Sequence, residues 1–436
     1  MSEPAEALRV RDRVPTPHRP NEVDLRYCVW ELTLACDLGC KHCGSRAGKA
    51  RASELTTAEA LDVVRQLAEL GCREVFLIGG EAYLREDWDV IAAAIGAAGM
   101  RCGMTTGARA LSPERIARAA AAGIDAFSLS LDGLERTHDL LRGSPGSFRA
   151  ILNAADALRN AGIHFGFNTQ INRASLPELP AIAQLLVERG GVAWQVQLTV
   201  PMGRAADRPD LLLQPIDLLE VFPLLAWLRE NRLEPAGVEL QPGNDIGYYG
   251  AWDQRLRRAG VQWSPCSAGR NTLGIEADGT IKGCPSLPTH AYGGGSVRDR
   301  SIADILNQAA PVTHLRQRTR DDLWGFCGTC TWADQCLGGC SWTAHVYMGK
   351  TGNNPFCIHR VQTLEQRGMH EYLTRVAAPP GLPFDHGQFS LEERALPQPA
   401  AEPQLGGLPL SHVLALTPHS GSAWDMDTLR RFVRRV

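Results

Sequence analysis

The sequence predicts an α/β fold, a parallel sheet with surrounding helices, followed by a small cysteine-rich domain that contains a β-hairpin. Strand-like runs rich in β-branched and aromatic residues alternate with Ala- and Leu-rich helical stretches from residue 26 to about residue 235, as in parallel α/β proteins. Beyond them, seven of the 13 cysteines lie between Cys266 and Cys357. Within this region, residues 272–281 form two short apolar runs around an Asp-Gly turn, which is typical of a hairpin.

Composition excludes several classes of protein. The 436 residues carry a net charge of −3, so no electrostatic argument favours nucleic acid or an acidic membrane surface as a partner. No apolar run approaches the ~20 residues needed to span a bilayer, and the polar N-terminus does not resemble a signal peptide. We therefore expect a soluble cytoplasmic protein whose cysteines hold metal or clusters instead of disulfides. Three cysteines in apolar contexts are expected to be ordinary buried thiols: Cys28, Cys72 and Cys102.

The elements of the predicted sheet can be placed in order along the chain. The first strand spans residues 27–34 and leads directly into a cysteine motif. A helix over residues 56–70 starts at a threonine and is followed by Gly71, which are typical helix boundaries. Five further strands are expected, each followed by a helix: residues 74–78, 101–105, 126–131, 164–171 and 193–199. Barrel enzymes keep their chemistry at the carboxyl ends of such strands.

The loop after the first strand reads Cys36-Asp-Leu-Gly-Cys40-Lys-His-Cys43. Three thiolates this close in sequence can hold one face of a cubane iron–sulfur cluster, which normally takes four thiolates. One iron would then stay open for a small molecule. A structural zinc site is the alternative, because cysteines two residues apart are common in such sites. The three-residue spacing before the two-residue spacing favours the cluster.

This Cys-x3-Cys-x2-Cys motif after a first strand resembles the signature of radical S-adenosylmethionine enzymes. The resemblance implies a partial (β/α)6 TIM-like barrel over residues 26–235. It also implies a [4Fe-4S] cluster on Cys36, Cys40 and Cys43, whose open iron binds S-adenosylmethionine and which cleaves it to a 5′-deoxyadenosyl radical. His42 stands where relatives have an aromatic residue beside the adenine, and we expect it to contact the adenine.

Residues after the second and third strands resemble further cofactor contacts of the family. Gly79-Gly80-Glu81 is similar to the Gly-Gly-Glu-Pro segment whose backbone and glutamate hold the methionyl amino group, with Ala82 in place of the proline. Glycine permits close approach of the main chain, and a carboxylate complements an ammonium group. Thr105 is expected at the same site, followed by Thr106 where relatives often carry asparagine.

The fourth and later strands complete the expected cofactor site. The resemblance implies that Ser130 hydrogen-bonds the ribose and that Arg142 pairs with the methionyl carboxylate, for which its planar fork is suited. A solvated arginine at a helix end is the alternative for Arg142. Asp132 is assigned to the same site, although it could instead face the substrate or cap the next helix. Further candidates to line the barrel lie near the ends of strands five and six: Asn168, Thr169 and Gln197.

The second group of cysteines resembles the SPASM domain, the auxiliary-cluster extension of radical enzymes that modify peptides and proteins. We expect it over residues 236–375. The family's interleaved ligand order implies an outer cluster on Cys327, Cys330, Cys336 and Cys357, and an inner cluster on Cys266, Cys284 and Cys340. Some relatives supply a fourth inner thiolate shortly after the first cysteine, which residues 267–272 do not. The inner cluster therefore has an open iron or a non-cysteine ligand, and a zinc ribbon is the alternative for the whole group.

The two ends of the chain lie outside these domains. Residues 1–25 form an N-terminal extension, too short for the winged-helix leader-binding domain usually fused ahead of such barrels. Residues 376–436 form a Pro-rich C-terminal tail, which predicts a strap or a linker. The last stretch, residues 424–436, has the pattern of an amphipathic helix with a basic face.

Together these resemblances imply a maturase that abstracts a hydrogen atom from a residue of a ribosomally made peptide and leaves a cross-link or an oxidised residue. The expected cofactors are three [4Fe-4S] clusters and S-adenosylmethionine. The expected partners are the peptide, a separate leader-binding protein and an electron donor such as flavodoxin or ferredoxin.

Two alternatives remain. One is a maturase of a protein substrate, of the formylglycine-forming sulfatase activator type. Those enzymes tend to carry an aspartate after the second cysteine of the auxiliary region, whereas Pro285 follows Cys284 here. The other is a non-catalytic cysteine-rich zinc or electron-carrier protein, which would have no use for Glu81, Ser130 and Arg142.

Overall fold

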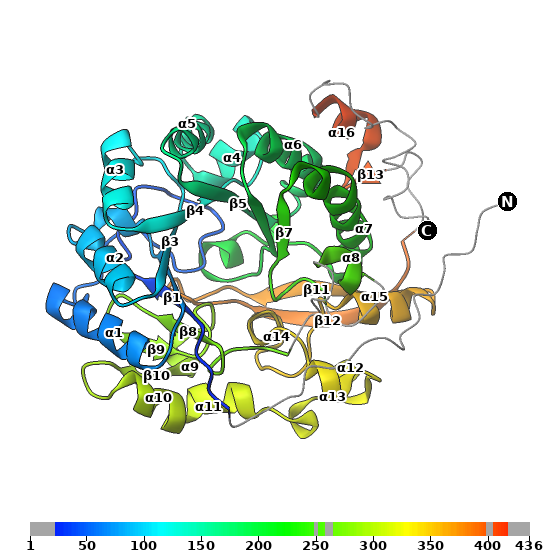
Figure 1. The fold of residues 1–436 in the computed structure, drawn as a ribbon. Helices are drawn as coiled ribbons and strands as arrows, with labels where there is room; N and C mark the ends of the chain where they lie inside the picture. Colours follow the sequence, from blue (N-terminus) through cyan, green and yellow to red (C-terminus); the bar gives the residue numbers. More distant parts are fainter. Residues whose placement is uncertain (1–21, 248–251, 258–264, 398–403, 417–436) are drawn as a thin grey trace.

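A ten-stranded sheet in the order β10-β9-β8-β1-β2-β3-β4-β5-β6-β7 forms the centre of the molecule (Figure 1). The computed structural model describes residues 22–247, 252–257, 265–397 and 404–416. The strands from β1 to β7 are parallel neighbours: β1 (Tyr27–Glu31), β2 (Glu74–Ile78), β3 (Arg101–Thr106), β4 (Ile124–Ser130), β5 (His164–Ile171), β6 (Ala193–Leu198) and β7 (Glu239–Pro242). The six expected strands are present, and the mixed α/β fold class is confirmed.

Helices cover the outer face of the parallel strands (Figure 1). They are α1 (Thr57–Glu69), α2 (Trp88–Ala97), α3 (Pro113–Ala121), α4 (Glu135–Arg142), α5 (Ser147–Asn160), α6 (Leu179–Arg189) and α7 (Leu218–Leu228). The expected threonine cap of α1 is present, because the Thr56 hydroxyl accepts a hydrogen bond from the Glu59 amide while the Glu59 carboxylate accepts from the Thr56 amide. The largest fully buried side chains include Trp30, Trp88 and Trp194, which lie in the shared core of sheet and helices.

The expected hairpin forms and joins the same sheet. β8 (Thr272–Ile275) runs parallel to β1, and β9 (Thr280–Lys282) and β10 (Gly293–Ser296) continue the sheet in antiparallel fashion. Gly279, in the Asp-Gly turn, has a φ of +87°, which favours glycine. The sheet therefore runs unbroken from the barrel into the cysteine-rich region, and β7 lies beyond residue 235. The boundary at 235/236 stays a prediction.

Short helices follow β7. They are α8 (Asp253–Leu256), α9 (Thr289–Tyr292), α10 (Ile302–Gln308), α11 (Ala310–Gln317), α12 (Gly325–Thr329), α13 (Ala333–Cys336), α14 (Ser341–Met348) and α15 (Ile358–Glu365). Two of them contain a cysteine, Cys327 in α12 and Cys336 at the end of α13. Cys340 directly precedes α14 and Cys357 directly precedes α15. Each of these two cysteines is therefore the N-cap residue of a helix, and the helix fixes the position of its backbone.

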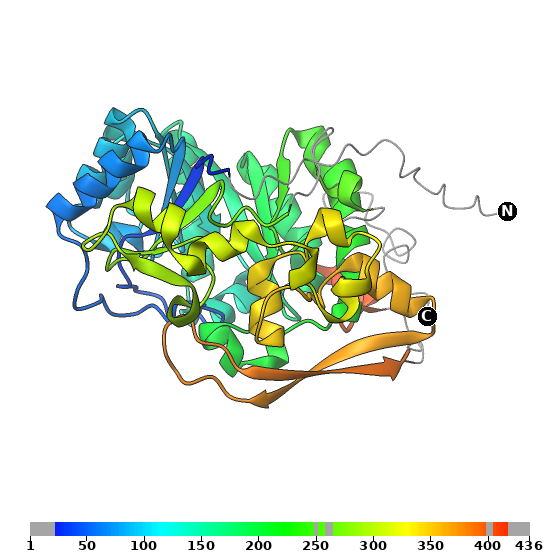
Figure 2. The same ribbon diagram turned by 90° about the horizontal axis from the view of Figure 1, so that it is seen from below.

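The tail is more ordered than a linker. β11 (Met369–Ala377) and β12 (Gln388–Ala395) form a long hairpin along one flank of the molecule (Figure 2). We call the connecting segment, residues 378–387, the strap. Beyond it lie β13 (Gln404–Leu405), β14 (Leu408–Pro409) and α16 (Leu410–Leu416). Residues 1–21 and the expected amphipathic helix at residues 424–436 lie outside the described residues.

One helical stretch corrects an expectation from the sequence. Residues Pro209–Ala236 are long and apolar enough to cross a membrane, although no run of that kind was expected. However, 78% of the apolar window is buried inside the protein. The stretch includes α7 and continues through a π-helical turn, Arg229–Leu233, so it serves as a core helix.

Candidate active site

One cavity of about 500 Å³ connects the carboxyl ends of the parallel strands to the cysteine-rich region. This volume is in the range of ~300–1,000 Å³ that is typical of small-molecule sites. Its lining includes six of the expected cluster ligands: Cys36, Cys40, Cys43, Cys266, Cys284 and Cys340. It also includes most of the expected cofactor residues: His42, Gly79, Gly80, Glu81, Thr105, Ser130, Arg142 and Gln197. We call the first three cysteines the opening trio and the other three the inner trio.

The loop of the opening trio packs tightly against the loop that follows β2. A Cβ atom on Gly80 would lie 2.0 Å from the Ala35 carbonyl oxygen and 2.7 Å from the Cys36 Cβ. A Cβ atom on Gly79, whose φ is +154°, would lie 2.2 Å from the Thr33 carbonyl oxygen. Only glycine fits these two positions, so the Gly-Gly pair fixes the opening trio as well as lining the cavity.

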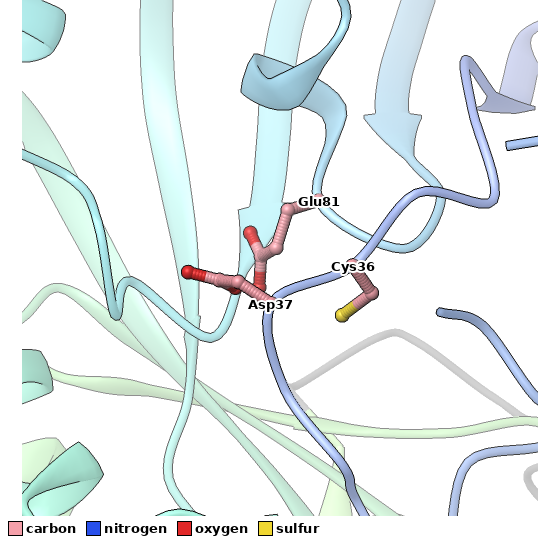
Figure 3. A group of neighbouring side chains, drawn as sticks. All are labelled: Cys36, Asp37 and Glu81. Carbon is pink, nitrogen blue, oxygen red and sulfur yellow. The ribbon is translucent and has the colours of Figure 1, made fainter. Parts of the chain in front are cut away.

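Glu81 lies on this loop, and its side chain is beside Asp37 and Cys36 (Figure 3). One carboxylate oxygen accepts the Thr106 hydroxyl at 2.5 Å and the other accepts the Gly107 amide at 2.7 Å. Thr106, which replaces the family's usual asparagine, thus holds the glutamate in place. Burial raises the pKa of Glu81 to about 7. Possible metal-ligand atoms of Cys36, Asp37 and Glu81 lie within 4.8 Å of one another, which makes this corner receptive to a cation.

Asp132 lies behind the cavity wall and organises two residues that line it. Its Oδ2 atom lies 2.9 Å from His42 Nε2 and 2.5 Å from Arg142 Nη2. Although burial alone would raise it, the charges of Arg142 and His42 hold the pKa of Asp132 well below its ordinary value. Arg142 also donates from Nη1 to Cys40 Sγ at 3.6 Å. Asp132 is therefore placed to position His42 and Arg142, and it does not line the cavity as expected.

Thr169 also lies outside the cavity. Its hydroxyl donates to the Leu131 carbonyl at 2.6 Å and accepts from Trp194 Nε1 at 2.9 Å. Side chains alternate between the two faces of a strand, so Asn168 and Gln170 face the interior while Thr169 faces the helices. The Thr169 side chain is thus turned away from the cofactor contact expected of it.

The interior face of β5 and β6 forms a patch of four carboxamides. Asn168 lies beside Gln195 and Gln170 beside Gln197 in the strand register, and all four line the cavity. The Asn168 Oδ1 atom is buried and has no hydrogen-bond partner among the described residues. We call this patch the carboxamide wall. The period-two pattern of polar residues at 168/170 and 195/197 could have identified the wall in the sequence.

Arg204 holds the opening trio from the other side. Its Nε donates to the Cys40 carbonyl at 2.7 Å, its Nη1 to the Ala47 carbonyl at 3.0 Å, and its amide to the Cys43 carbonyl at 2.9 Å. Arg204 and Arg142 are the only arginine or lysine side chains in the described lining of the cavity. Each bonds protein groups but keeps one nitrogen without a partner among the described residues, Arg142 Nε and Arg204 Nη2. Most of the other polar side chains in the lining are neutral. Sequence reasoning gave Arg204 no role.

The strap packs against the chain just after the opening trio and contributes to the cavity. Phe384 lines the cavity, and its amide donates to the Gly44 carbonyl at 3.2 Å. Asp385 accepts from Arg46 Nε at 2.8 Å, and its carbonyl accepts the Gly203 amide at 2.8 Å. The tail therefore closes one side of the site, which its proline content alone could not predict.

The cysteines beyond residue 265 divide between two cavities. The inner trio lines the large cavity, whereas a separate small cavity is lined by Cys327, Cys330, Cys336 and Cys357, together with Trp332 and His359. These are the two sets expected from the interleaved ligand order, and the ligand assignment itself stays a prediction.

The buried thiols fit iron–sulfur clusters. Burial raises the pKa of the Cys36 thiol to about 12, that of Cys284 to about 11 and that of Cys357 to about 12. A thiolate at such a site needs a cation beside it. Groups of three and four converging cysteines are the donor sets that cubane iron–sulfur clusters take.

Family models and curated relatives agree on the class of protein. The model described as the radical SAM superfamily matches residues 30–184, and that of an iron-sulfur cluster-binding domain, SPASM, matches residues 266–331. AdoMet-dependent heme synthase of Nitratidesulfovibrio vulgaris is 30% identical over 79% of this chain and 97% of its own length. AdoMet-dependent heme synthase of Methanosarcina barkeri is 31% identical over 77% and 97%. Mycofactocin maturase MftC of Mycobacterium tuberculosis is 28% identical over 77% and 84%.

Solved structures share the fold. Streptococcus suis SuiB bound to S-adenosylmethionine superposes with a TM-score of 0.61 at 15% identity, covering 77% of each chain. Native anSMEcpe with bound AdoMet gives 0.61 at 16% identity, covering 76% of this chain and 94% of that chain. At such low identity these likenesses establish the architecture alone, a partial barrel followed by a hairpin-containing cysteine-rich region.

Proposed function

Because the chain belongs to the radical S-adenosylmethionine superfamily and carries its iron–sulfur cluster-binding domain, we propose that it matures a ribosomally made peptide by removing a hydrogen atom from one residue. The product is a cross-link or an oxidised residue. The chain is an enzyme that uses [4Fe-4S] chemistry and S-adenosylmethionine. When bound together, these groups supply a 5′-deoxyadenosyl radical that abstracts hydrogen.

The chain's own residues hold and orient the cofactors in this proposal. Cys36, Cys40 and Cys43 hold the opening cluster. Glu81 accepts hydrogen bonds from the methionyl ammonium. Burial disfavours the ionised form of Glu81, and the positive charge of the ammonium offsets this effect. Gly79 and Gly80 let the main chain approach the same group.

A second set of residues binds the rest of S-adenosylmethionine. Ser130 bonds the ribose, Thr105 and Gln197 line the cofactor site, and His42 contacts the adenine. Arg142 binds the methionyl carboxylate with the part of its fork that Asp132 leaves available.

The observation that supports a peptide as the substrate is the row of neutral carboxamide side chains on the cavity wall. A peptide main chain offers one N–H and one C=O per residue, and a carboxamide can serve both groups. The three carboxamides of the wall that are not assigned to the cofactor, Asn168, Gln170 and Gln195, therefore complement an extended peptide. The two arginines in the lining are already bonded to protein groups.

A tetrapyrrole is the second candidate substrate, because the relatives named as heme synthases are 30% and 31% identical to this chain over nearly their whole lengths. Heme and its precursors carry carboxylate side chains. A site for them needs arginine or lysine, since burying an unpaired carboxylate is costly. Arg142 and Arg204 are the only such residues in the described lining, and each already bonds protein groups through two of its three side-chain nitrogens. The wall therefore favours the peptide.

The remaining parts of the system follow from this chemistry. Two auxiliary clusters, on the inner trio and on the outer four cysteines, bring the total to three. An electron donor such as flavodoxin or ferredoxin reduces the opening cluster, and a separate protein presents the peptide leader. The reaction takes place in the cytoplasm.

The test is a direct competition between the two substrate classes. The anaerobically reconstituted enzyme is given S-adenosylmethionine, dithionite and either Fe-coproporphyrin III or the peptides encoded by short reading frames beside its gene. Mass spectrometry should find a peptide that has lost two hydrogen atoms. One 5′-deoxyadenosine should be formed for each molecule of modified peptide. Conversion of the porphyrin with no change in any peptide would overturn the proposal.

A further inference from the structure

The inner trio lacks a fourth cysteine. A cubane cluster normally takes four thiolates, and the inner trio supplies three. The cysteines outside the two cluster regions cannot help, because they are buried in the barrel core and none lines the cavity: Cys28, Cys72 and Cys102. Ser267 follows the first inner cysteine, but its hydroxyl is already hydrogen-bonded to the Thr272 hydroxyl at 2.9 Å. The fourth ligand must come from another part of the chain or from outside it.

Asp245 is a buried carboxylate that lines the same cavity. It follows β7, is 3% exposed, and lies in the lining together with the inner trio. The described part of the chain contains four other buried aspartates, each with an arginine nitrogen within 4 Å of its carboxylate: Asp132 with Arg142, Asp217 with Arg173, Asp253 with Arg257 and Asp385 with Arg46. Asp245 has no such cation among the described residues. A buried carboxylate is costly without a cation, so this position calls for one.

The local backbone fixes where the Asp245 carboxylate lies. Its Oδ2 atom accepts the Leu198 amide at the end of β6, at 2.7 Å. Its Oδ1 atom packs over Gly243, where a Cβ would lie only 2.7 Å away, and the Gly243 amide is itself bonded to the Val196 carbonyl at 2.7 Å. One oxygen is thus tied to β6, and the turn is shaped to accommodate the other.

The carboxylate shares its cavity with Cys340, which directly precedes α14, and with the other two members of the inner trio.

We propose that Asp245 is the fourth protein ligand of the inner cluster, bound through the carboxylate oxygen that the Leu198 amide does not occupy. Its ligand set is then three thiolates and one carboxylate. Carboxylate is a harder ligand than thiolate, so the iron that it holds is the one most easily exchanged. Asp245 would hold this iron in the same cavity that the opening trio lines. The inference depends on the assignment of the inner trio to one cluster, and it holds for either candidate substrate.

The experiment compares three variants of the full-length reconstituted enzyme. Asp245→Cys restores four thiolates, and Asp245→Asn keeps the size and an oxygen for the Leu198 amide. Ser286→Ala removes a hydroxyl two residues after Cys284 that lines the same cavity and is a rival oxygen ligand. The readouts are iron content, the EPR spectrum of each reduced cluster, and its midpoint potential. Added S-adenosylmethionine identifies the opening cluster, because only that signal should shift.

Asp245→Cys should keep the full iron content, change the EPR signal of the inner cluster and lower its potential. Asp245→Asn should lose one iron of that cluster on mild oxidation, giving a three-iron signal. Ser286→Ala should match the wild type in all three readouts. The proposal is overturned if both Asp245 variants keep the wild-type inner-cluster spectrum and potential, or if Ser286→Ala changes them while Asp245→Asn does not. Because Asp245→Cys is expected to hold its cluster, poor folding of Asp245→Asn would still leave a decisive variant.

Discussion

The opening trio and the inner trio meet in one cavity but are built in different ways. Cys36, Cys40 and Cys43 belong to a single loop, which is held by two close glycine contacts and by Arg204. The inner trio comes from three separate segments, which meet because β8 pairs with β1 and α14 begins at the cavity. The first site is therefore formed by local geometry, whereas the second depends on the whole cysteine-rich region being docked on the barrel.

Buried charges make that docking specific. Lys282 is fully buried, and its Nζ lies 2.7 Å from Glu276 Oε1. Arg51 joins Glu276 to Glu31 of β1, with 3.1 Å to each. This network links the hairpin to Glu31, the last residue of β1, which leads into the cysteine loop. We therefore expect that substitutions in the opening trio leave the inner trio intact. Substitutions in the docking network should disturb the inner trio before they affect the opening trio.

The largest expected effect tests the independence of the opening trio. Replacing Cys36, Cys40 and Cys43 together with alanine should abolish formation of 5′-deoxyadenosine, because no cluster is left to hold S-adenosylmethionine. Iron content should fall by about a third, since one cubane of three is lost. Cys102→Ala, which removes a buried thiol outside the cavity, should keep both values near wild type. Continued 5′-deoxyadenosine production in the triple variant would refute the assignment.

The next effect tests the inner trio in the same way. Cys340→Ala leaves Cys266 and Cys284 as the only inner thiolates, too few to hold a cubane firmly. Reductive cleavage of S-adenosylmethionine should continue, because the opening loop is intact, while formation of modified substrate should collapse. Measuring 5′-deoxyadenosine and product in one reaction separates the two steps. A product yield equal to wild type would mean that Cys340 has no part in the reaction.

A smaller effect tests the docking network. Lys282→Met removes the cation nearest Glu276 and leaves that buried carboxylate with only Arg51 and the Thr289 hydroxyl, so we expect a loss of about 3–5 kcal/mol of stability. The thermal midpoint of unfolding and proteolysis of the hairpin measure this loss. The double variant Lys282→Met/Glu276→Gln should recover part of it, because no unpaired charge remains. If the single variant unfolds at the wild-type temperature, the network does not hold the two regions together.

The same contrast explains how far the sequence could predict the molecule. The opening motif, the Gly-Gly pair and the six strands depend on spacing and periodicity within short segments, and the structure contains them. The proline content of the tail predicted a strap or a linker, but not where a strap would lie, because its position depends on pairs such as Arg46 with Asp385, which are 339 residues apart. Two other features could not be predicted for the same reason: the pairing of β8 with β1, and the lack of a cation beside Asp245 among the described residues. Each depends on which distant segments meet.

The smallest effect concerns the strap, where Phe384 combines strain with a cavity contact. Its φ of +57° is unusual for any residue with a side chain, and Lys282 Nζ lies 3.9 Å from its ring centroid. Phe384→Ala loses the cation–π contact, worth about 0.5–2 kcal/mol, and keeps the strain. Phe384→Gly loses the same contact but relieves the strain, so it should be the more stable of the two by about 1 kcal/mol. Thermal midpoints measure the difference.

Leu382→Ala is the matched control for the strap, because Leu382 lies in the same segment but is 63% exposed and does not line the cavity. Its thermal midpoint and its ratio of product to 5′-deoxyadenosine should equal those of the wild type. Both Phe384 variants should lower that ratio, since a wider opening at the strap lets the radical react elsewhere. If the ratio is unchanged in both, Phe384 only anchors the strap, and the wall of the site is formed by the barrel and the cysteine-rich region alone.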